Sequence, residues 1–336
     1  MKPLVSILIP AYNAERTISQ TLESAIAQTW PHKEIIVVND GSTDRTLDVA
    51  QRYGSKVKVV SIDHQGGQVA RNHAYSLSEG DFIQWLDADD LLGPEKIEKQ
   101  LASLTGDCSE RVLLSSSWAS FYHRTAKAKF LPSSLWQDLS PTEWFLRQMG
   151  ENLAMLPASW LTSRKLADAA GPWDTRLHVH QDCEYFARVL LASEGTRFIS
   201  EAKVFYRIGG SKRVSFIGKS EEKKQSLLLT TKLQIEYLRS LEESERVRKV
   251  CLRYLQNVYY MFIHLKRPDL AEELQELARG FRGRLEEPSL IRKYAWIRPI
   301  FGEEVAQWAQ STLPTLKHAS IMGFDKAMFL LRGDQE

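Results

Sequence analysis

Residues 34–46, EIIVVNDGSTDRT, pass from a short apolar run into a polar turn and then toward the start of a helix. The run from Glu34 to Val38 is rich in β-branched residues, which is typical of a strand covered on both faces. The turn formers Asn39 to Ser42 follow it, and Asp44 can serve as an N-cap for the helical pattern beyond. The stretch predicts a strand, a tight turn and a helix, the unit from which parallel α/β sheets are built.

The same alternation continues on both sides of this stretch. Further strands are expected at residues 5–9, 57–62 and 82–86, with helices after Asn13 and over residues 68–79. Strands that alternate with helices imply right-handed crossovers and a mainly parallel sheet. The predicted fold class is therefore α/β, with an open sheet of the nucleotide-binding type flanked by helices.

The pattern changes near residue 220, where long helical repeats rich in Leu, Glu, Lys and Arg begin. Helices are expected over residues 227–241, 247–265 and 270–281. We therefore predict an α/β domain over residues 1–218 and a helical C-terminal extension over residues 219–336.

Composition excludes several classes of protein. The 336 residues carry 44 basic and 42 acidic side chains, a net charge of +2, so no nucleic-acid partner is expected. Three widely spaced cysteines without metal-ligand spacing favour a reducing compartment, which predicts a cytoplasmic location. The apolar run from Leu4 to Pro10 suits a buried strand better than a signal peptide, and no segment reaches the roughly 18 apolar residues of a membrane span.

Carboxylates gather where another predicted strand ends, in residues 81–90, DFIQWLDADD. Because the carboxyl ends of parallel strands meet at one edge of a sheet, we expect Asp87, Asp89 and Asp90 to lie near Asp40. Turn formation and helix capping are the alternative roles, but a cap uses only one carboxylate. Mg²⁺ or Mn²⁺ prefers such oxygen ligands and leaves room for substrate phosphates, so we favour a metal site. The sequence contains neither of the two common glycine-rich phosphate-binding motifs, the GxxxxGK[ST] loop and the GxGxxG fingerprint.

Five stretches together resemble the family 2 glycosyltransferases of GT-A fold. They are VSILIPAYN, EIIVVNDGSTDRT, the ARN of residues 70–72, WLDADD and HQDCEYFARVL, in the family's order over roughly residues 3–215. The resemblance implies that residues 1–218 form a GT-A catalytic domain. It also implies an inverting transferase that uses a nucleotide-diphosphate sugar, usually a UDP-sugar, with a divalent metal.

The resemblance also implies roles for particular residues on the donor side. Asp40 accepts a hydrogen bond from the uracil ring, Asp87 meets ribose or metal, and Asp89 coordinates the metal directly. Asp90 is expected to cap a helix or to support the metal ligands. The residues that border the base, ribose or phosphates are Pro10, Tyr12, Glu15 and Arg71. Arg213 belongs to a loop, residues 206–213, that the family closes over the donor diphosphate, although a solvated basic loop is the alternative.

The acceptor side follows from the same resemblance. Asp182 matches the family's general base, and its alternative role is a favourable charge at a helix N-terminus. Asp174 is the second candidate for the base, although the role of a turn aspartate is favoured for it. Trp160 and Trp173 are placed near the acceptor because an indole can stack on a sugar, with core packing as the alternative.

The expected function is metal-assisted transfer of a sugar, of the hexosyl type, to a hydroxyl of a glycan or lipid-linked acceptor, as in polysaccharide biosynthesis. The alternative is a scaffold or regulator of the same fold that binds nucleotide sugar without turnover. A nucleotidyltransferase would need a glycine- and lysine-rich loop near the N-terminus, which is absent. The apolar stripes of the extension are expected to pack on the catalytic domain. The alternative for residues 296–301 and 321–332 is a surface contact with the inner face of the membrane or with a partner.

Overall fold

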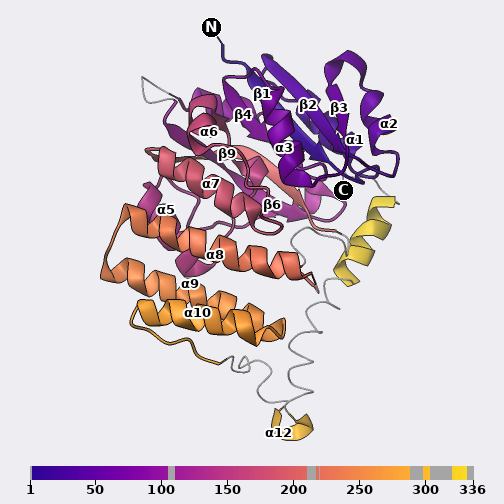
Figure 1. The fold of residues 1–336 in the computed structure, drawn as a ribbon. Helices are drawn as coiled ribbons and strands as arrows, with labels where there is room; N and C mark the ends of the chain where they lie inside the picture. The colour runs from indigo at the N-terminus through magenta and orange to yellow at the C-terminus, as the bar shows by residue number, and fades with distance from the viewer. Residues whose placement is uncertain are drawn as a thin grey trace.

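The computed structural model shows a mixed α/β molecule with two sheets and a layer of helices (Figure 1). The structure describes residues 2–104, 110–209, 217–218, 220–287, 298–302 and 320–330.

The main sheet has the strand order β3-β2-β1-β4-β8. Strands β1 to β4 are mutually parallel and match the four predicted strands to within two residues at each end, whereas the short β8 is antiparallel. The register pairs Ala11 with Asn39 and Asp40 with Ile62, so the carboxyl ends of neighbouring strands align. The bounds are β1 Val5–Ala11, β2 Lys33–Asp40, β3 Lys58–Ile62, β4 Phe82–Trp85 and β8 Thr162–Ser163.

Four helices connect or follow these strands, namely α1 Ile18–Ile26, α2 Thr46–Gln51, α3 Gly67–Ser76 and α4 Lys96–Ala102. The expectation that Asn13 caps α1 is wrong, because Thr17 holds that position. Asn13 instead adopts a left-handed φ of 48° and accepts a hydrogen bond from the Thr43 N–H at 2.8 Å. Arg45, not the expected Asp44, is the N-cap of α2, although Asp44 Oδ1 accepts the Thr46 N–H at 2.9 Å.

The second sheet has the order β5-β9-β6-β7 and lies against the first. Its strands are β5 Leu91–Leu92, β6 Val112–Phe121, β7 Lys129–Phe130 and β9 Gly195–Arg207. The pairing of β5 with β9 brings the end of the DADD stretch next to Arg207. Helices α5 Pro141–Glu151, α6 Arg164–Ala170 and α7 Gln181–Ala192 cover this region, with short 3-10 turns at Gly54–Lys56, Thr125–Lys127 and Pro157–Ser159.

The three long helices expected after residue 220 are confirmed as α8 Glu221–Leu241, α9 Glu245–His264 and α10 Pro268–Gly280. Ser220 and Ser244 cap the first two with their hydroxyls. In Figure 1 the helices stack beside α5 and α7, on the side of the molecule away from β2 and β3. Their apolar side chains form one continuous core with Trp85 and Ile83 of the main sheet, so the domain division after residue 218 stays a prediction.

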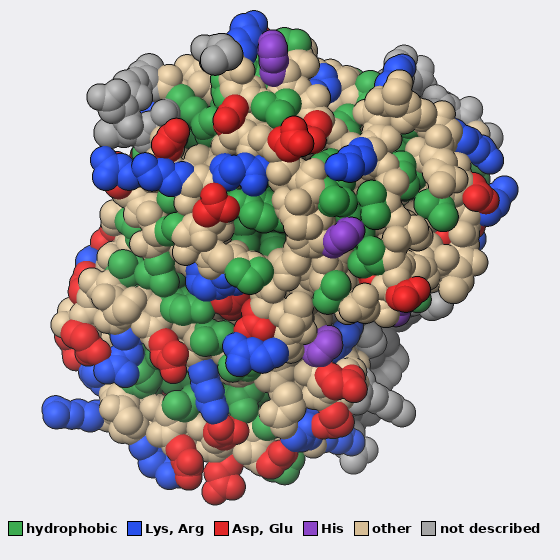
Figure 2. Space-filling model, turned by 45° about the horizontal axis from the view of Figure 1, so that its top comes forward, with side chains coloured by type: hydrophobic (Ala, Val, Ile, Leu, Met, Phe, Trp, Pro, Cys, Tyr) green, Lys and Arg blue, Asp and Glu red, His purple; other side chains and the backbone are tan. Residues whose placement is uncertain are grey.

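The segments considered for membrane or partner contact lie in different places. Residues 298–301 form the short helix α12, and residues 320–330 form a helix docked through Asp325, whose carboxylate accepts the Arg124 Nε–H at 2.8 Å. Along the described residues we find no helix with the length and apolarity needed to span a membrane. On the face drawn in Figure 2, basic and acidic side chains are interspersed.

Candidate active site

Asp40 ends β2 and organises the turn that precedes α3. Its side chain is buried, with Oδ1 accepting the Gln65 N–H at 2.8 Å and Oδ2 accepting the Gly66 N–H at 3.0 Å. Gly66 has a φ of 99°, which favours glycine at this position. A carboxylate that accepts two backbone hydrogen bonds is fixed in place, so Asp40 sets the conformation of residues 64–66.

A stacked pair of rings stands beside Asp40. Tyr12 follows β1, is 47% exposed, and stacks on His64 with ring centroids 4.1 Å apart. His64 Nδ1 lies 2.9 Å from Asp40 Oδ2, which ties the pair to the strand end. Pro10 lies in β1 and is partly exposed at the same edge. This edge therefore offers an aromatic surface and polar groups of the kind that a nucleoside base requires.

Glu15 lies one turn further along and contacts the protein itself. Its Oε2 accepts the Arg45 N–H at 3.2 Å and lies 3.4 Å from Arg45 Nε. These contacts join the loop after β1 to the start of α2. Glu15 thus stabilises the rim of the edge formed by Tyr12 and Asp40.

Arg71 links α3 to the DADD stretch. Its Nη2 donates to Asp87 Oδ1 at 2.7 Å, and its guanidinium lies over the indole of Trp173, 4.6 Å from the ring centroid. Trp173 stacks on Tyr185 of α7 with ring centroids 4.1 Å apart and planes inclined by 5°. The arginine is buried, yet its Nε has no protein partner. A cation held at one end with a free donor suits a phosphate ligand.

The other two aspartates of DADD differ in environment. Asp89 is exposed, and its backbone carbonyl accepts the Arg207 Nε–H at 2.8 Å. Asp90 is buried, and its Oδ1 accepts the Arg207 N–H at 2.9 Å. Helix α4 begins only at Lys96, so the expectation that Asp90 caps it is wrong; Asp90 holds the end of β9. Burial raises the pKa of Asp90 well above its ordinary value, helped by the neighbouring carboxylates.

Asp182 lies in the first turn of α7, as expected. Burial raises the pKa of its carboxyl above the ordinary value, while His180 opposes the rise and the charge of Asp87 adds to it. Arg71 also favours the ionised form. The charges of Arg71 and Asp87, about a hundred residues earlier in the chain, thus act on the carboxyl of Asp182. A carboxylate whose pKa is raised is a stronger base than a solvated aspartate.

Two tryptophans considered for the acceptor side are placed differently from the expectation, whereas Asp174 fits its expected turn role. Trp160 and Trp173 are 1% and 2% exposed, so neither ring has an open face for a sugar, and the stacking role is corrected to a packing role. Asp174 pairs with Arg176 at 2.7 Å, and this contact lowers the pKa of Asp174. A lowered pKa makes a weaker base, which fits the turn role. Arg213 lies outside the described residues.

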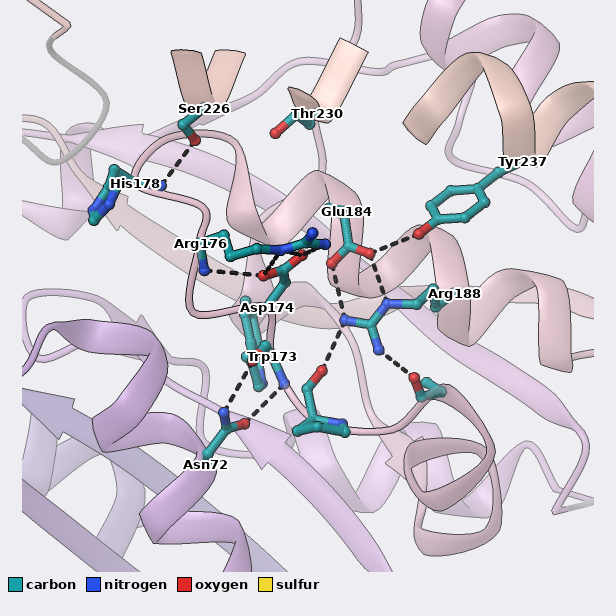
Figure 3. A network of polar contacts seen from close by, with 12 residues as sticks. Asn72, Trp173, Asp174, Arg176, His178, Glu184, Arg188, Ser226, Thr230 and Tyr237 are labelled. Atoms are coloured by element: carbon teal, nitrogen blue, oxygen red, sulfur yellow. Dashed lines mark hydrogen bonds and ion pairs between the residues drawn. The ribbon is translucent and has the colours of Figure 1, made fainter. Parts of the chain in front are cut away.

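Sequence reasoning missed His64, Asn72 and the anchoring role of Arg207. Asn72 lies within the ARN stretch, but its partner is the backbone of Trp173, to which its side chain donates at 2.9 Å and from which it accepts at 2.8 Å (Figure 3). The two residues are 101 positions apart, so no local spacing could show the pair. His64 stands alone between turn residues and offers no motif at all.

The oxygen donors at this edge fit a divalent metal. Asp87 and Asp89 are hard ligands at the end of β4, of the kind that Mg²⁺ and Mn²⁺ prefer. Across the described ranges, no three His, Cys, Asp or Glu side chains group closely enough to hold a metal by themselves. The residues therefore fit an ion that completes its shell with water and substrate phosphates.

A parallel sheet with aspartates and aromatic rings near its strand ends defines an α/β protein whose sheet edge suits a nucleotide-type ligand. Residues 6–124 match the model of glycosyl transferase family 2, so this segment is similar to that family. An uncharacterized glycosyltransferase of Rickettsia typhi is 43% identical over 99 residues, which cover 30% of this chain and 31% of that protein. The putative teichuronic acid biosynthesis glycosyltransferase TuaG of Bacillus subtilis is 42% identical over 104 residues, 30% of this chain and 41% of that protein. The chain thus spans less than half the length of these two relatives.

Solved structures extend the likeness in fold to most of the chain. The crystal structure of S. aureus TarS residues 1–349 in complex with UDP-GlcNAc superposes with a TM-score of 0.58 at 17% identity, covering 86% of this chain and 95% of that one. The fold is therefore the GT-A fold, with a helical C-terminal region.

Proposed function

We propose that the chain is an inverting, metal-dependent glycosyltransferase that moves a sugar from a nucleotide-diphosphate donor to a hydroxyl acceptor. One observation carries this proposal. The charges of the Arg71–Asp87 ion pair act on Asp182, whose pKa is raised, which supports one site with a group suited to phosphate and a group suited to take a proton.

The donor is a UDP-sugar in this proposal. Its base lies against Tyr12 and His64, with Pro10 bordering it and Asp40 holding the turn that presents the rings. The similarity of the fold to TarS, a protein solved with UDP-GlcNAc, supports this choice. The loop that contains Arg213 is proposed to contact the diphosphate from the other side.

Asp87 and Asp89 would hold the divalent metal together with the donor phosphates. Such an ion supplies electrostatic stabilisation for the negative charge that develops on the leaving diphosphate. The guanidinium of Arg71 would contact the same group, while Asp87 and the ring of Trp173 keep it oriented.

Asp182 acts as the general base. The acceptor oxygen attacks the anomeric carbon from the face opposite the diphosphate, Asp182 takes the hydroxyl proton, and the bond to the phosphate oxygen breaks with its electron pair leaving on the nucleotide diphosphate. One displacement inverts the configuration at the anomeric carbon. The raised pKa of Asp182 improves its match to the proton that it must remove.

The acceptor is proposed to be a glycan or a lipid-linked saccharide, and the sugar a hexose or a derivative of one, as in polysaccharide biosynthesis. The relation to a putative teichuronic acid biosynthesis enzyme supports this class. We place the protein in the cytoplasm, in peripheral contact with the inner face of the membrane. The exposed Ile321, Phe324 and Leu330 of the last described helix supply the apolar surface for such a contact.

The test is release of UDP from a panel of UDP-glucose, UDP-galactose and UDP-GlcNAc, measured with Mn²⁺, with Mg²⁺ and with a chelator. We expect UDP release from at least one donor with metal, loss of release with the chelator, and loss in the Asp89→Ala variant. UDP binding without release from any donor, with saccharide acceptors present, would favour the scaffold alternative.

A further inference from the structure

Helix α8 carries an unusual set of buried polar side chains on the face that meets α7. Ser226, Thr230 and Gln234 are 3%, 0% and 1% exposed. They follow one another at intervals of four residues, so they lie on one face of the helix, and Tyr237 continues the same line. We call these four residues the polar face of α8. Buried polar groups need hydrogen-bond partners, so the contacts of this face show its role.

The partners all belong to residues 178–184, the segment that carries Asp182. Ser226 Oγ accepts the N–H groups of His178 at 2.8 Å and Val179 at 3.2 Å. Thr230 Oγ1 lies 3.5 Å from the Val179 carbonyl, and Gln234 Nε2 donates to the Cys183 carbonyl at 2.8 Å. Tyr237 ends the line by donating to Glu184 Oε1 at 2.8 Å (Figure 3). The contacts therefore lie on both sides of Asp182 along the chain.

This segment needs such support because its backbone is irregular. His180, directly before α7, has a left-handed φ of 53°, which is uncommon for a residue with a side chain. Irregular backbone cannot satisfy its own N–H and carbonyl groups, so its conformation depends on partners from elsewhere. Apolar side chains on α8 would bury the segment equally well but would not fix the direction of its peptide groups.

We infer that the polar face of α8 positions Asp182 for proton abstraction, which makes the helical region part of the active-site framework. The inference rests on the proposed function of Asp182 as the base. Ser226, Thr230 and Gln234 are positioning residues, because they act through the backbone of residues 178–183. Charged groups that face Asp182 from other elements, namely Arg71 and Asp87, belong to the donor side and are unchanged by substitutions on α8.

The chain offers a matched control on the same helix. Thr231 is as buried as Thr230, but its hydroxyl donates to the Leu227 carbonyl of its own helix at 2.7 Å. Thr231→Val therefore removes a buried hydroxyl from α8 without touching residues 178–184. Ser226→Ala removes the acceptor of two buried N–H groups of that segment, and Gln234→Met gives a second variant of similar volume.

The experiment measures three quantities in the full chain for the wild type and the three variants. They are the kcat of UDP-sugar hydrolysis, the Kd of UDP with Mn²⁺, and the rate of amide hydrogen exchange. The UDP-sugar used is the one in the panel that the wild type hydrolyses fastest. We expect Ser226→Ala and Gln234→Met to lower kcat about 10- to 100-fold, because a misplaced base loses the reactive geometry. The UDP Kd should stay within about twofold, since the donor end is not touched. In both variants the amides of residues 178–184 should exchange faster than in the wild type. Thr231→Val should leave kcat, the UDP Kd and the exchange of these amides near the wild-type values.

The inference is overturned if both variants keep the kcat of Thr231→Val, even with faster exchange at residues 178–184. It is also overturned if kcat and UDP affinity fall in parallel while exchange rises throughout the sheet, since that would show general destabilisation. Failure of the proposed function is a separate result. In that case the wild type itself releases no UDP from any donor, and the inference that α8 positions a catalytic base is rejected as well.

Discussion

The two ends of the proposed active site are held in different ways. At the donor end several contacts join residues that lie fairly close in sequence, such as Asp40 with Gln65, 25 positions apart, and Arg71 with Asp87, 16 apart. Arg207, which holds Asp90 over 117 positions, is the exception. At the acceptor end Ser226 contacts His178 over 48 positions, and Asn72 contacts Trp173 over 101. The donor end is thus built by loops that follow neighbouring parallel strands, whereas the acceptor end depends on helix packing far along the chain.

This difference shows which functional residues can be predicted from such a sequence. A strand–turn–helix unit places its polar residues by local geometry, so the motif and the site coincide. A candidate base can be recognised from the motif around it. The residues of a distant helix that orient this base have no motif and cannot be recognised from the sequence. The predictions below test whether the two ends can be damaged independently.

The largest effect is expected from Asp182→Asn. Without the base, UDP-sugar turnover should fall about 10²- to 10⁴-fold, whereas the Kd of UDP with Mn²⁺ should stay near the wild-type value. Thermal unfolding should occur at the same or a higher temperature, since the variant removes a carboxylate whose ionised form is disfavoured by burial. Turnover, calorimetry and a melting curve check the three parts. Turnover within about tenfold of the wild type would remove Asp182 from the mechanism.

Arg71→Met should damage the donor end next most. Loss of a charge-assisted contact to phosphate costs about 1.5–3 kcal/mol, so UDP affinity should fall about 10- to 100-fold. Arg176→Met is the matched control, because Arg176 also pairs with an aspartate but is largely exposed. Calorimetry with UDP measures both variants. Equal affinities would show that Arg71 only packs against Trp173.

The pH dependence should separate activity from stability. Because the pKa of Asp182 is raised in the folded protein, turnover should be lost on acidification at a higher pH than an ordinary aspartate, near 3.8, would give. The folded state binds this proton more tightly than the unfolded state, so the same group should make the protein less stable as pH rises through that pKa. Turnover profiles of the wild type and melting curves of the wild type and Asp182→Asn measure the two trends. A stability difference between them that does not change with pH would contradict this account.

Tyr237→Phe should have the smallest effect. Glu184 keeps its contacts to Arg188 at 2.7 and 2.9 Å, so the variant loses one hydrogen bond, about 1 kcal/mol of stability, with turnover within about threefold. Tyr259→Phe is the control, because Tyr259 donates to Glu287 at 2.8 Å away from α7. Urea unfolding and turnover compare the two. A loss of turnover as large as that of Ser226→Ala would mean that the support of Asp182 extends the full length of α8.

Much of the donor half could be predicted from the sequence. The four parallel strands follow from the period of the sequence, and Asp40 and Asp87 stand at the carboxyl ends of β2 and β4, as the strand-end rule predicts. The cap at Asn13 was wrong because its side chain instead holds the Thr43 backbone across the loop. A turn-forming residue has the same local signature in both roles.

The acceptor half could be predicted only in outline. Asp182 and its helix were expected, but Trp173 was expected near a sugar and is instead buried between Arg71 and Tyr185. Tryptophan occurs both in protein cores and in sugar-binding sites, so only the exposure of its ring in the structure distinguishes the two roles. The burial of Ser226 and Gln234 could not be predicted, because a polar residue in a leucine-rich helix is expected to face solvent unless its partner is known.

The most direct test of the central claim, a metal-assisted nucleotide site at the strand ends, is calorimetric titration of UDP into the wild type, Asp89→Ala and Asp182→Asn, with Mn²⁺ and with a chelator. We expect the wild type and Asp182→Asn to bind UDP with Mn²⁺, and binding to be lost with the chelator and in Asp89→Ala. Absence of binding in the wild type, or equal binding in Asp89→Ala, would contradict the account.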